Sequence, residues 1–286
     1  MLYEKFSKWY GTHYKVLMII PLIVFLLCSS IFINNKSKNG EFFPKDIDLS
    51  GGTLFNIYTS NIPLGARETI ELANLNFREV KGHDSNEIIA VMVEAGPDYD
   101  ETEVRELVES VFPDVEYDVR NVGPSMGESF MSSAQKAIIF AFIMMGLVLA
   151  FIFKQPIVAL TVILSGFLNV FEAAAVMTLF GVKLAPHTIG ALLMLMGWGV
   201  DSEVLFDTKL LREKGGEPKK RALTAMKTAM TMSFAVFASL SSLYFISTST
   251  MIKDMALVLL LGAFFDIINT WFQSLSMVLW FMEAKQ

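Results

Sequence analysis

Six long runs of apolar residues are distributed unevenly along this chain. One run lies near the N-terminus, and five follow one another in the second half of the sequence. Each approaches the ~20 residues that an α-helix needs to cross the hydrocarbon core of a bilayer. The pattern therefore predicts a polytopic α-helical membrane protein with six transmembrane helices, at residues 16–33, 137–153, 157–180, 188–206, 229–247 and 255–280.

The segment between the first two runs, residues 34–136, has a different pattern. Apolar and polar residues alternate as in β-strands at 53–59, 87–94 and 115–122, and amphipathic helices are expected at 65–74 and 100–112. Asp100, followed by Glu103, can cap the second helix, and Pro113 can end it. We expect one small α/β domain outside the membrane, with its helices on one face of a sheet.

Composition agrees with a membrane protein. The 286 residues are 53% hydrophobic and only 18% charged, and the mean hydropathy is +0.49. The single cysteine, Cys28, excludes an internal disulfide and is interpreted as a thiol within a helix core. Three scattered histidines do not suggest a metal site. Gly51 and Gly52 resemble part of a phosphate loop, but no Gly-Lys-Ser/Thr follows, so a turn is expected. We expect no enzyme activity, cofactor, metal or nucleic-acid partner.

Charge predicts the orientation. The connection 207–228 carries seven Lys or Arg residues, and Lys154 lies in the second connection. The positive-inside rule then places the N-terminus (1–15) and the C-terminus (281–286) in the cytoplasm. Residues 34–136 hold 9 Lys/Arg against 19 Asp/Glu and are expected outside the cytoplasmic membrane. The connection 207–228 is also amphipathic and is expected to lie against anionic lipid. The first run is interpreted as an uncleaved signal anchor.

Two carboxylates lie within apolar runs, where charge is costly. Asp201 and Asp266 are placed about 20 Å and 16 Å from the outer surface at ~1.5 Å per residue. If they faced each other, desolvation and like-charge repulsion would favour proton binding by at least one of them. Such a pair is typical of a proton relay, although buried helix contacts are an alternative. Asn269, three residues after Asp266, is expected to donate to its carboxylate.

Other polar and small residues could support this pair. Glu172 and Asn169 lie on one helical face and could form either a relay or a satisfied interhelical contact. Gly197 and Gly199 are expected to allow close approach of a neighbouring helix. Lys227 could reach inward to Asp201 or simply flank the membrane.

Three motifs in order resemble the SecD/SecF family of protein translocase subunits, within the RND superfamily, over nearly the whole chain. Residues 46–53, Asp-Ile-Asp-Leu-Ser-Gly-Gly-Thr, resemble the signature Gly-Ile-Asp-Phe-Thr-Gly-Gly-Thr. Residues 122–127 resemble the Val-Gly-Pro motif before the second span. Residues 197–201, continuing to Leu-Arg-Glu at 211–213, resemble the fourth-span signature.

The resemblance implies half of an RND-type layout with a ferredoxin-like external domain. It further implies an accessory subunit that pairs with SecD, attaches to a SecYEG-type channel and uses the ion gradient to move secreted, unfolded polypeptides. The family's fourth-span aspartate corresponds to Asp201. Bacterial members have an arginine in the fifth span, where this chain has Thr228, and Asp266 is more similar to the archaeal branch.

Two other functions stay open at this point. Half of a small-molecule exporter would need a ligand-sized cleft in the external domain. A purely structural partner of the channel would not need Asp201 or Asp266 in ionisable form.

Overall fold

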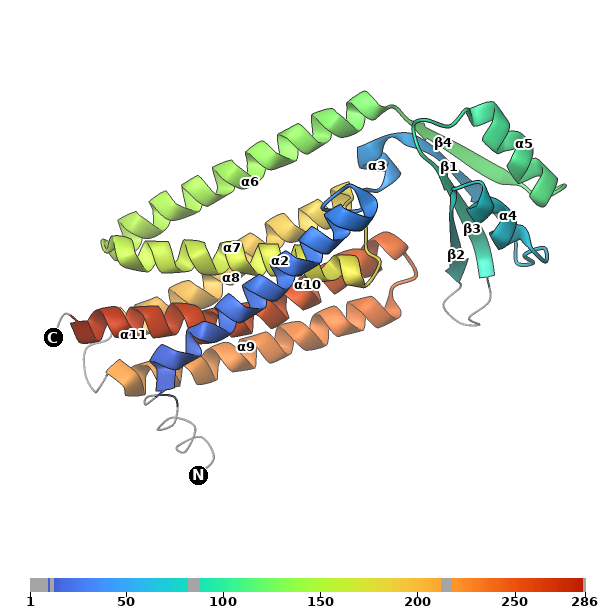
Figure 1. Ribbon diagram of the computed structural model, residues 1–286. Helices are drawn as coiled ribbons and strands as arrows, with labels where there is room; N and C mark the ends of the chain where they lie inside the picture. The colour runs from blue at the N-terminus through green and yellow to red at the C-terminus, as the bar shows by residue number, and fades with distance from the viewer. Residues whose placement is uncertain (1–9, 11–12, 82–87, 212–217, 285–286) are drawn as a thin grey trace.

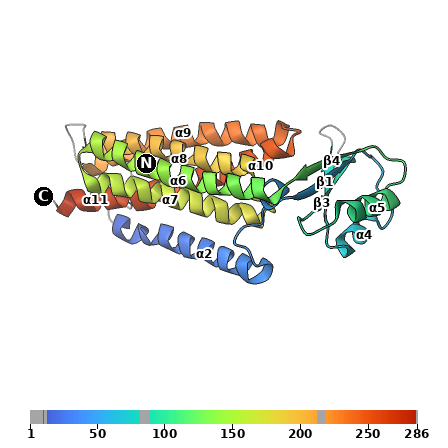
Figure 2. The ribbon, with the colours of Figure 1, turned by 90° about the horizontal axis from the view of Figure 1, so that it is seen from above.

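The chain folds into a long helical bundle with a small α/β domain at one end (Figure 1). The computed structural model describes Tyr10 and residues 13–81, 88–211 and 218–284. Seen from above, the helices run side by side and the α/β domain projects beyond them (Figure 2). The start of α2 and the end of α11 both lie at the opposite end of the bundle from this domain.

Within the described ranges, the bundle contains six long helical segments. Proline occupies the first position of four of them, where its missing N–H is not needed and its fixed φ suits a helix. The helices are α2 (Ile19–Asn39), α6 (Pro124–Phe153), α7 (Pro156–Leu179), α8 (Pro186–Leu211) and α9 (Pro218–Ile246), and the last segment joins α10 (Thr250–Ile268), the π-helix η1 (Asn269–Ser274) and α11 (Leu275–Ala284).

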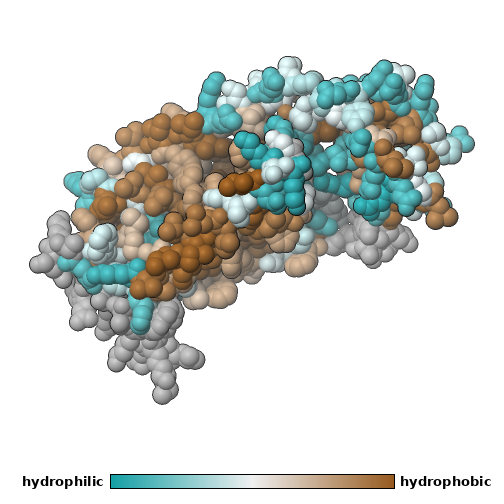
Figure 3. Space-filling view, viewed as in Figure 1, coloured by the Kyte–Doolittle hydropathy of each residue, from teal (hydrophilic) through white to brown (hydrophobic). Residues whose placement is uncertain are grey.

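Length and hydropathy allow five helices of the described chain to cross a membrane. These are His13–Lys38, Pro124–Phe153, Pro156–Leu179, Pro186–Leu211 and Thr224–Ile246. Cys28 is buried in α2, as expected for a helix-core thiol. Apolar residues cover much of the visible surface of the bundle, whereas the α/β end is more hydrophilic (Figure 3).

The helices α7, α8 and α10 form the centre of the bundle. In the apolar window of α7, 61% of residues are buried, against 6% in α9. Gly262 of α10 lies directly against Leu195 of α8: a Cβ at Gly262 would come within 2.3 Å of the Leu195 Cδ2 atom. The central helices therefore pack closely, while α6 and α9 leave most of their apolar surface uncovered.

The α/β domain is a four-stranded antiparallel sheet in the order β2-β3-β1-β4. Its elements confirm the expected strands and helices: β1 (Gly52–Ile57), α4 (Ala66–Leu72), β3 (Ile88–Ala95), α5 (Glu101–Val111) and β4 (Tyr117–Val122). Asp100 caps α5 by accepting from the Thr102 N–H. Side chains of α4 and α5 pack with Phe55 and Val93 on one face of the sheet.

One strand was missed. The edge strand β2 (Asn76–Lys81) has few apolar residues, and its pairing with β3 stabilises it more than its own composition does.

The α/β domain is attached where two distant motifs meet. A Cβ at Gly51, which follows the short helix α3 (Ile47–Ser50), would lie 2.7 Å from the Pro124 Cα at the start of α6. Gly52 pairs with Val122 across β1 and β4, and its φ is +135°. In place of the expected turn, Gly51 ends α3 and Gly52 begins β1, and their close packing brings residues 46–53 and 122–127 together.

A third segment braces this attachment. The Asp46 N–H donates to the Leu184 carbonyl over 2.9 Å, and the Leu184 N–H donates to the Pro44 carbonyl over 2.7 Å. Leu184 belongs to the loop between α7 and α8, so the bundle itself contacts the approach to the α/β domain.

The basic connection 207–228 differs from the expected surface helix. Its described residues do not form a separate helix: residues up to Leu211 continue α8, and residues from Pro218 onward belong to α9. Residues 212–217, with Arg212 and Lys214, lie outside the described chain, as do 1–9, 11–12, 82–87 and 285–286.

Candidate functional site

Polar side chains from three helices meet inside the apolar bundle. On each helix, members of this set lie three or four residues apart, with Ser202–Glu203, Asn269–Thr270 and Gln273–Ser274 as adjacent pairs, which places them along one face. All are buried. They are Thr161, Ser165, Asn169 and Glu172 of α7; Ser202, Glu203 and Asp207 of α8; and Asp266, Asn269, Thr270, Gln273 and Ser274 of α10 and η1.

One half of this cluster is joined by two amides. The Asn269 Nδ2 donates to Asn169 Oδ1 and to Glu172 Oε2, each over 2.8 Å. The Asn169 Nδ2 in turn donates to Asp266 Oδ1 over 2.8 Å. The Glu172 Oε1 and Asn269 Oδ1 atoms are buried and have no hydrogen-bond partner among the described residues. This half therefore links α7 to α10 and η1 and keeps spare acceptors.

The other half centres on Glu203. The Thr270 Oγ1 lies 3.1 Å from Glu203 Oε1, and Ser274 donates to Glu203 Oε2. Asp207 follows one turn along α8 on the same face, and its buried Oδ2 has no hydrogen-bond partner in the part of the chain that the structure describes. This half links α8 to η1.

The π-helix lies at the centre of the cluster. Four of its six residues, Asn269, Thr270, Gln273 and Ser274, are buried polar groups. A π-helix has more residues per turn than an α-helix and is frequent at functional sites. Here it lets the adjacent Asn269 and Thr270 bond to different neighbours, Asn269 to α7 and Thr270 to α8.

Asp201 does not face Asp266, and that prediction is wrong. Asp201 is exposed and lines a groove of about 570 Å³ beside α9 residues such as Val236 and Ser239. Asp266 instead lies against the opposite side of α8, because a Cβ at Gly199 would be 3.2 Å from Asp266 Oδ1. Two residues turn an α-helix by about 200°. The body of α8 therefore separates the two carboxylates.

The glycine prediction is confirmed at one position only. Gly199 is closely approached, with Asn169 Nδ2 3.0 Å from its ideal Cβ. The prediction for Gly197 is wrong, because a Cβ at this position would meet no described atom within 4 Å. Gly197 lies on the groove side of α8, next to Asp201.

One further predicted contact differs in the structure, and the inward alternative for Lys227 is not adopted. Asn269 does not donate to Asp266; it bonds to Asn169, and Asn169 makes the bond to Asp266. Lys227 is exposed on α9 rather than turned inward to Asp201. The polar link between α8 and α9 in this region runs from Lys209 Nζ to Thr228 Oγ1, over 3.2 Å. Glu172 and Asn169 do share a face and a bonding partner, as expected.

Sequence reasoning missed the α8 acids that complete the cluster. Glu203 and Asp207 are four residues apart, and Asp266, Asn269, Thr270, Gln273 and Ser274 follow the spacing i, i+3, i+4, i+7, i+8. Such a polar stripe in an apolar helix is itself a signal of an interior-facing surface. Asp201 lies outside the stripe of α8.

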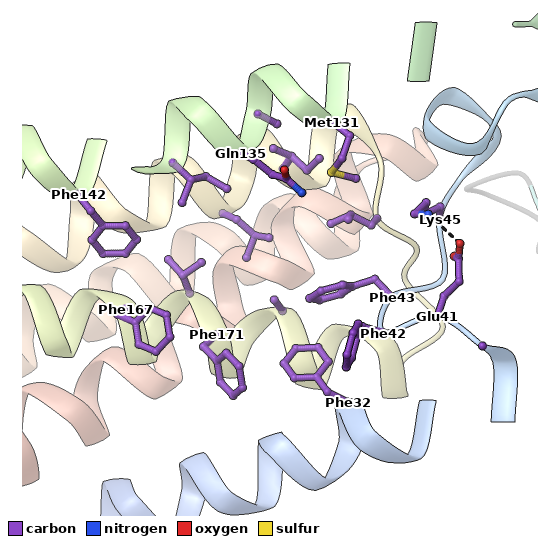
Figure 4. A pocket seen from close by; sticks show the side chains of 18 residues that line it. Phe32, Glu41, Phe42, Phe43, Lys45, Met131, Gln135, Phe142, Phe167 and Phe171 are labelled. Atoms are coloured by element: carbon purple, nitrogen blue, oxygen red, sulfur yellow. Dashed lines mark hydrogen bonds and ion pairs between the residues drawn. The ribbon is translucent and has the colours of Figure 1, made fainter. Parts of the chain in front are cut away.

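Other cavities lie away from this cluster. One of about 640 Å³ opens between α2, α6 and α7 and is lined mainly by apolar side chains (Figure 4). Phe32, Phe167 and Phe171 line it, and Lys45 pairs with Glu41 at one end (Figure 4). A smaller cavity of about 290 Å³ lies between the sheet and the ends of α8 and α10. Among the described residues, no group of His, Cys, Asp and Glu side chains is arranged to hold a metal ion.

Comparison with known proteins gives consistent matches. The family described as "Protein export membrane protein SecD/SecF, C-terminal" matches residues 103–284. "Protein-export membrane protein SecF" of Pyrococcus furiosus is 36% identical over 264 residues, covering 90% of this chain and 87% of that protein. The protein of the same name from Methanothermobacter thermautotrophicus is 30% identical over 283 residues, covering 95% and 94%.

Solved structures match the whole arrangement. The crystal structure of SecDF, a translocon-associated membrane protein from Thermus thermophilus, superposes with a TM-score of 0.74 at 19% identity. The match covers 96% of this chain but only 38% of that longer one. A structure of SecDF in a super-membrane-facing form gives a TM-score of 0.66 at 21% identity. At these identities the likeness concerns the fold.

Proposed function

The chain belongs to the SecD/SecF family of protein-export membrane proteins, and we propose from this premise that it couples an ion gradient to protein export. It is a membrane protein with an accessory role in Sec-dependent export. The finer proposal is that it pairs with SecD, attaches to a SecYEG-type channel and acts on secreted, unfolded polypeptide. The coverage of only 38% of the SecDF chain supports a second half as partner.

We further propose six membrane crossings in half of an RND-type layout. The sixth would be α10, η1 and α11, which run without a break from Thr250 to Ala284. The Lys253, Asp254 and Asp266 side chains lower the hydropathy of α10. RND-type units set two six-helix halves around a pseudo-symmetry axis, so a single half is incomplete. The uncovered apolar surfaces of α6 and α9 are available to a partner or to lipid.

A ferredoxin-like form is proposed for the α/β domain. Its elements follow the order β1-α4-β2-β3-α5-β4, and its sheet order is β2-β3-β1-β4. This is the connectivity of the split βαβ arrangement.

The proposed orientation puts both termini in the cytoplasm and the α/β domain outside. The basic residues Lys209 and Lys227 belong to the end of α8 and the start of α9, away from the α/β domain. That distribution follows the positive-inside rule.

The observation that carries ion coupling is the buried acidic cluster. Charged groups in the bilayer interior are costly and are found mostly where they face a bundle interior or a pathway. We propose that Asp266 belongs to an internal ion path. Asp201, on the exposed groove, would act separately, at the surface that meets the partner half. Asn169 would hold Asp266 in place, supported by Asn269 and Glu172, and Gly199 leaves room for the Asp266 carboxylate. Gly197 and Lys227 would belong instead to the exposed side of the bundle, where Asp201 lies.

Export by reconstituted vesicles tests this function. Wild-type chain would be combined with its SecD partner and channel, and export would be measured with and without an imposed proton or sodium gradient. We expect Asp201→Asn and Asp266→Asn each to remove the gradient-stimulated part while the SecD complex still co-purifies. Asp98→Asn, in a loop of the α/β domain, is the control and should export normally. Full gradient stimulation in the double variant Asp201→Asn/Asp266→Asn would leave only a structural role beside the channel.

The small-molecule exporter is not favoured. The described cavities along the α/β domain reach only about 290 Å³, at or below the ~300–1,000 Å³ of typical ligand pockets. The larger apolar cavity lies between helices of the bundle.

A further inference from the structure

The hydroxyl group of Thr270 lies between two buried carboxylates. Its Oγ1 atom is 3.1 Å from Glu203 Oε1 and 3.4 Å from Asp266 Oδ1. The two acids belong to different helices, α8 and α10, and Thr270 belongs to the π-helix that follows α10. A single side chain thus connects the two halves of the polar cluster.

One hydroxyl cannot donate to both acids, because it carries a single hydrogen. If both carboxylates were ionised, one of them would face the Thr270 oxygen, and the contact would be repulsive. Both contacts are hydrogen bonds only when one carboxyl group holds a proton and donates it to Thr270. The geometry therefore fits one proton shared by Asp266 and Glu203.

Burial strengthens this argument. Glu172, Glu203, Asp207 and Asp266 have exposed fractions of 0%, 1%, 2% and 7%. Each charged acid at the centre of a bilayer costs roughly 3 kcal/mol on the most lenient scale. Within the described chain, no ion pair joins any of the four to Lys, Arg or His. Protons are the simplest means of neutralising them.

The titratable groups of the polar cluster come from three helices, and the Tyr10 hydroxyl donates to the Trp271 carbonyl beside it. From α7 comes Glu172, from α8 come Glu203 and Asp207, and from α10 comes Asp266. Beyond these, Cys28 of α2 interacts electrostatically with Glu172, and the Lys227 side chain of α9 is exposed. Carboxyl groups and hydroxyls, rather than fixed cations, therefore make up the path.

We propose that Thr270 passes protons between Asp266 and Glu203, and that Asp207 is the next acceptor along α8. In one transfer, the O–H bond of the Asp266 carboxyl breaks as its proton bonds to Thr270 Oγ1. The original Thr270 O–H bond breaks as that proton bonds to Glu203 Oε1. Asp266 is left ionised, Glu203 is neutral, and the hydroxyl is regenerated. Asp207, whose buried Oδ2 has no hydrogen-bond partner within the described chain, lies one turn beyond Glu203.

This proposal deepens the ion-coupled function and rests on it, but it can fail separately. Wild-type chain and variants would be reconstituted with the SecD partner, and proton entry into vesicles would be followed after an imposed pH difference. Thr270→Val keeps the shape and removes the hydroxyl; it should slow proton entry at least tenfold. Thr270→Ser keeps the hydroxyl and should retain entry within about twofold of wild type.

Two further variants make the result specific. Thr178→Val removes a half-buried hydroxyl that lies outside the polar cluster and donates to the Ala175 carbonyl of its own helix, so proton entry should be unchanged. Glu203→Gln can still bond to Thr270 and Ser274 but cannot accept a proton, so entry should be lost, which tests the path even if Thr270→Val does not fold. Thermal unfolding of each purified variant reports folding.

The outcomes separate the two proposals. If Thr270→Val folds and admits protons at the wild-type rate, or if Glu203→Gln does so, the relay is overturned while gradient-driven export can still hold. Infrared spectra of the purified chain give an independent readout: a carboxyl C=O band lost in Glu203→Gln and altered in Thr270→Val supports the shared proton, whereas unchanged bands in both contradict it.

Discussion

Gly127 lies directly against the main chain of Leu49. A β-carbon built on Gly127, near the start of α6, would be 2.2 Å from the Leu49 carbonyl oxygen in α3. The first turn of α6 and the short helix before β1 are therefore in backbone contact. This contact holds the entry and exit of the α/β domain together.

Replacing Gly127 with alanine should destabilise this attachment. The neighbour is backbone, which cannot rotate away as a side chain can, so α3 and α6 must separate. Overpacking of this kind costs about 1–3 kcal/mol. We expect Gly127→Ala to lower the thermal unfolding midpoint in detergent. Gly190→Ala in α8 is the matched control, since a Cβ there meets no described atom within 4 Å. Equal midpoints for the two variants would show that the contact is looser than described.

The ion pair of Lys183 with Glu94 should matter through burial rather than charge alone. Lys183 lies in the loop before α8, and the Glu94 side chain, on β3, is only 7% exposed. Lys183→Met would leave Glu94 buried and unpaired, at a cost of about 3 kcal/mol. The double variant Lys183→Met/Glu94→Leu should recover most of that loss. Faster amide hydrogen exchange in β3 of Lys183→Met would show that the loss of stability arises at Glu94. If the stability losses of the two single variants simply added in the double variant, the two side chains would not be paired.

The α/β domain should lose a small part of its stability in acid. Hydrogen bonds from Arg105 and Asn121 lower the pKa of Glu101 below its ordinary value. Because the pKa of Glu101 is lower in the folded state than in the unfolded state, its hydrogen bonds contribute fully to stability above the pKa of glutamate in the unfolded chain. This contribution is lost as the pH falls through the pKa of the folded state. Glu101 is exposed, so the effect is modest.

The variant Glu101→Gln isolates this contribution. We expect wild type to be more stable than Glu101→Gln at neutral pH, and we expect this difference in stability to disappear as the pH is lowered through the acidic range. The unfolding midpoint, or hydrogen exchange in α5, measures it. If the stability difference between wild type and Glu101→Gln were the same at every pH, the hydrogen bonds from Arg105 and Asn121 would not lower the pKa of Glu101.

Much of the fold could be predicted from the sequence because long apolar runs and strand alternation are local signals. The positions of α5 and its Asp100 cap follow from neighbouring residues alone. The strand β2 could not be predicted, because its stability comes from pairing with β3 rather than from its own residues. Likewise, the ends of α8 and α9 extend past the apolar runs, since basic residues also form helix.

The site was only half predicted. Asp266, Asn169, Asn269 and Glu172 were recognised as acids and amides in apolar runs, and the structure brings them together. Depth along the helices alone pairs Asp201 with Asp266, but depth does not fix the side of a helix on which a residue lies. The rotational positions of Gly199 and Asp201 decide it, and these depend on how α8 packs against α7 and α10.

A single residue, Gly123, separates the end of β4 at Val122 from the start of α6 at Pro124. A strand that passes almost directly into a 30-residue helix leaves little slack between them. Any tilt of α6 would therefore move the sheet together with the helix as one rigid piece.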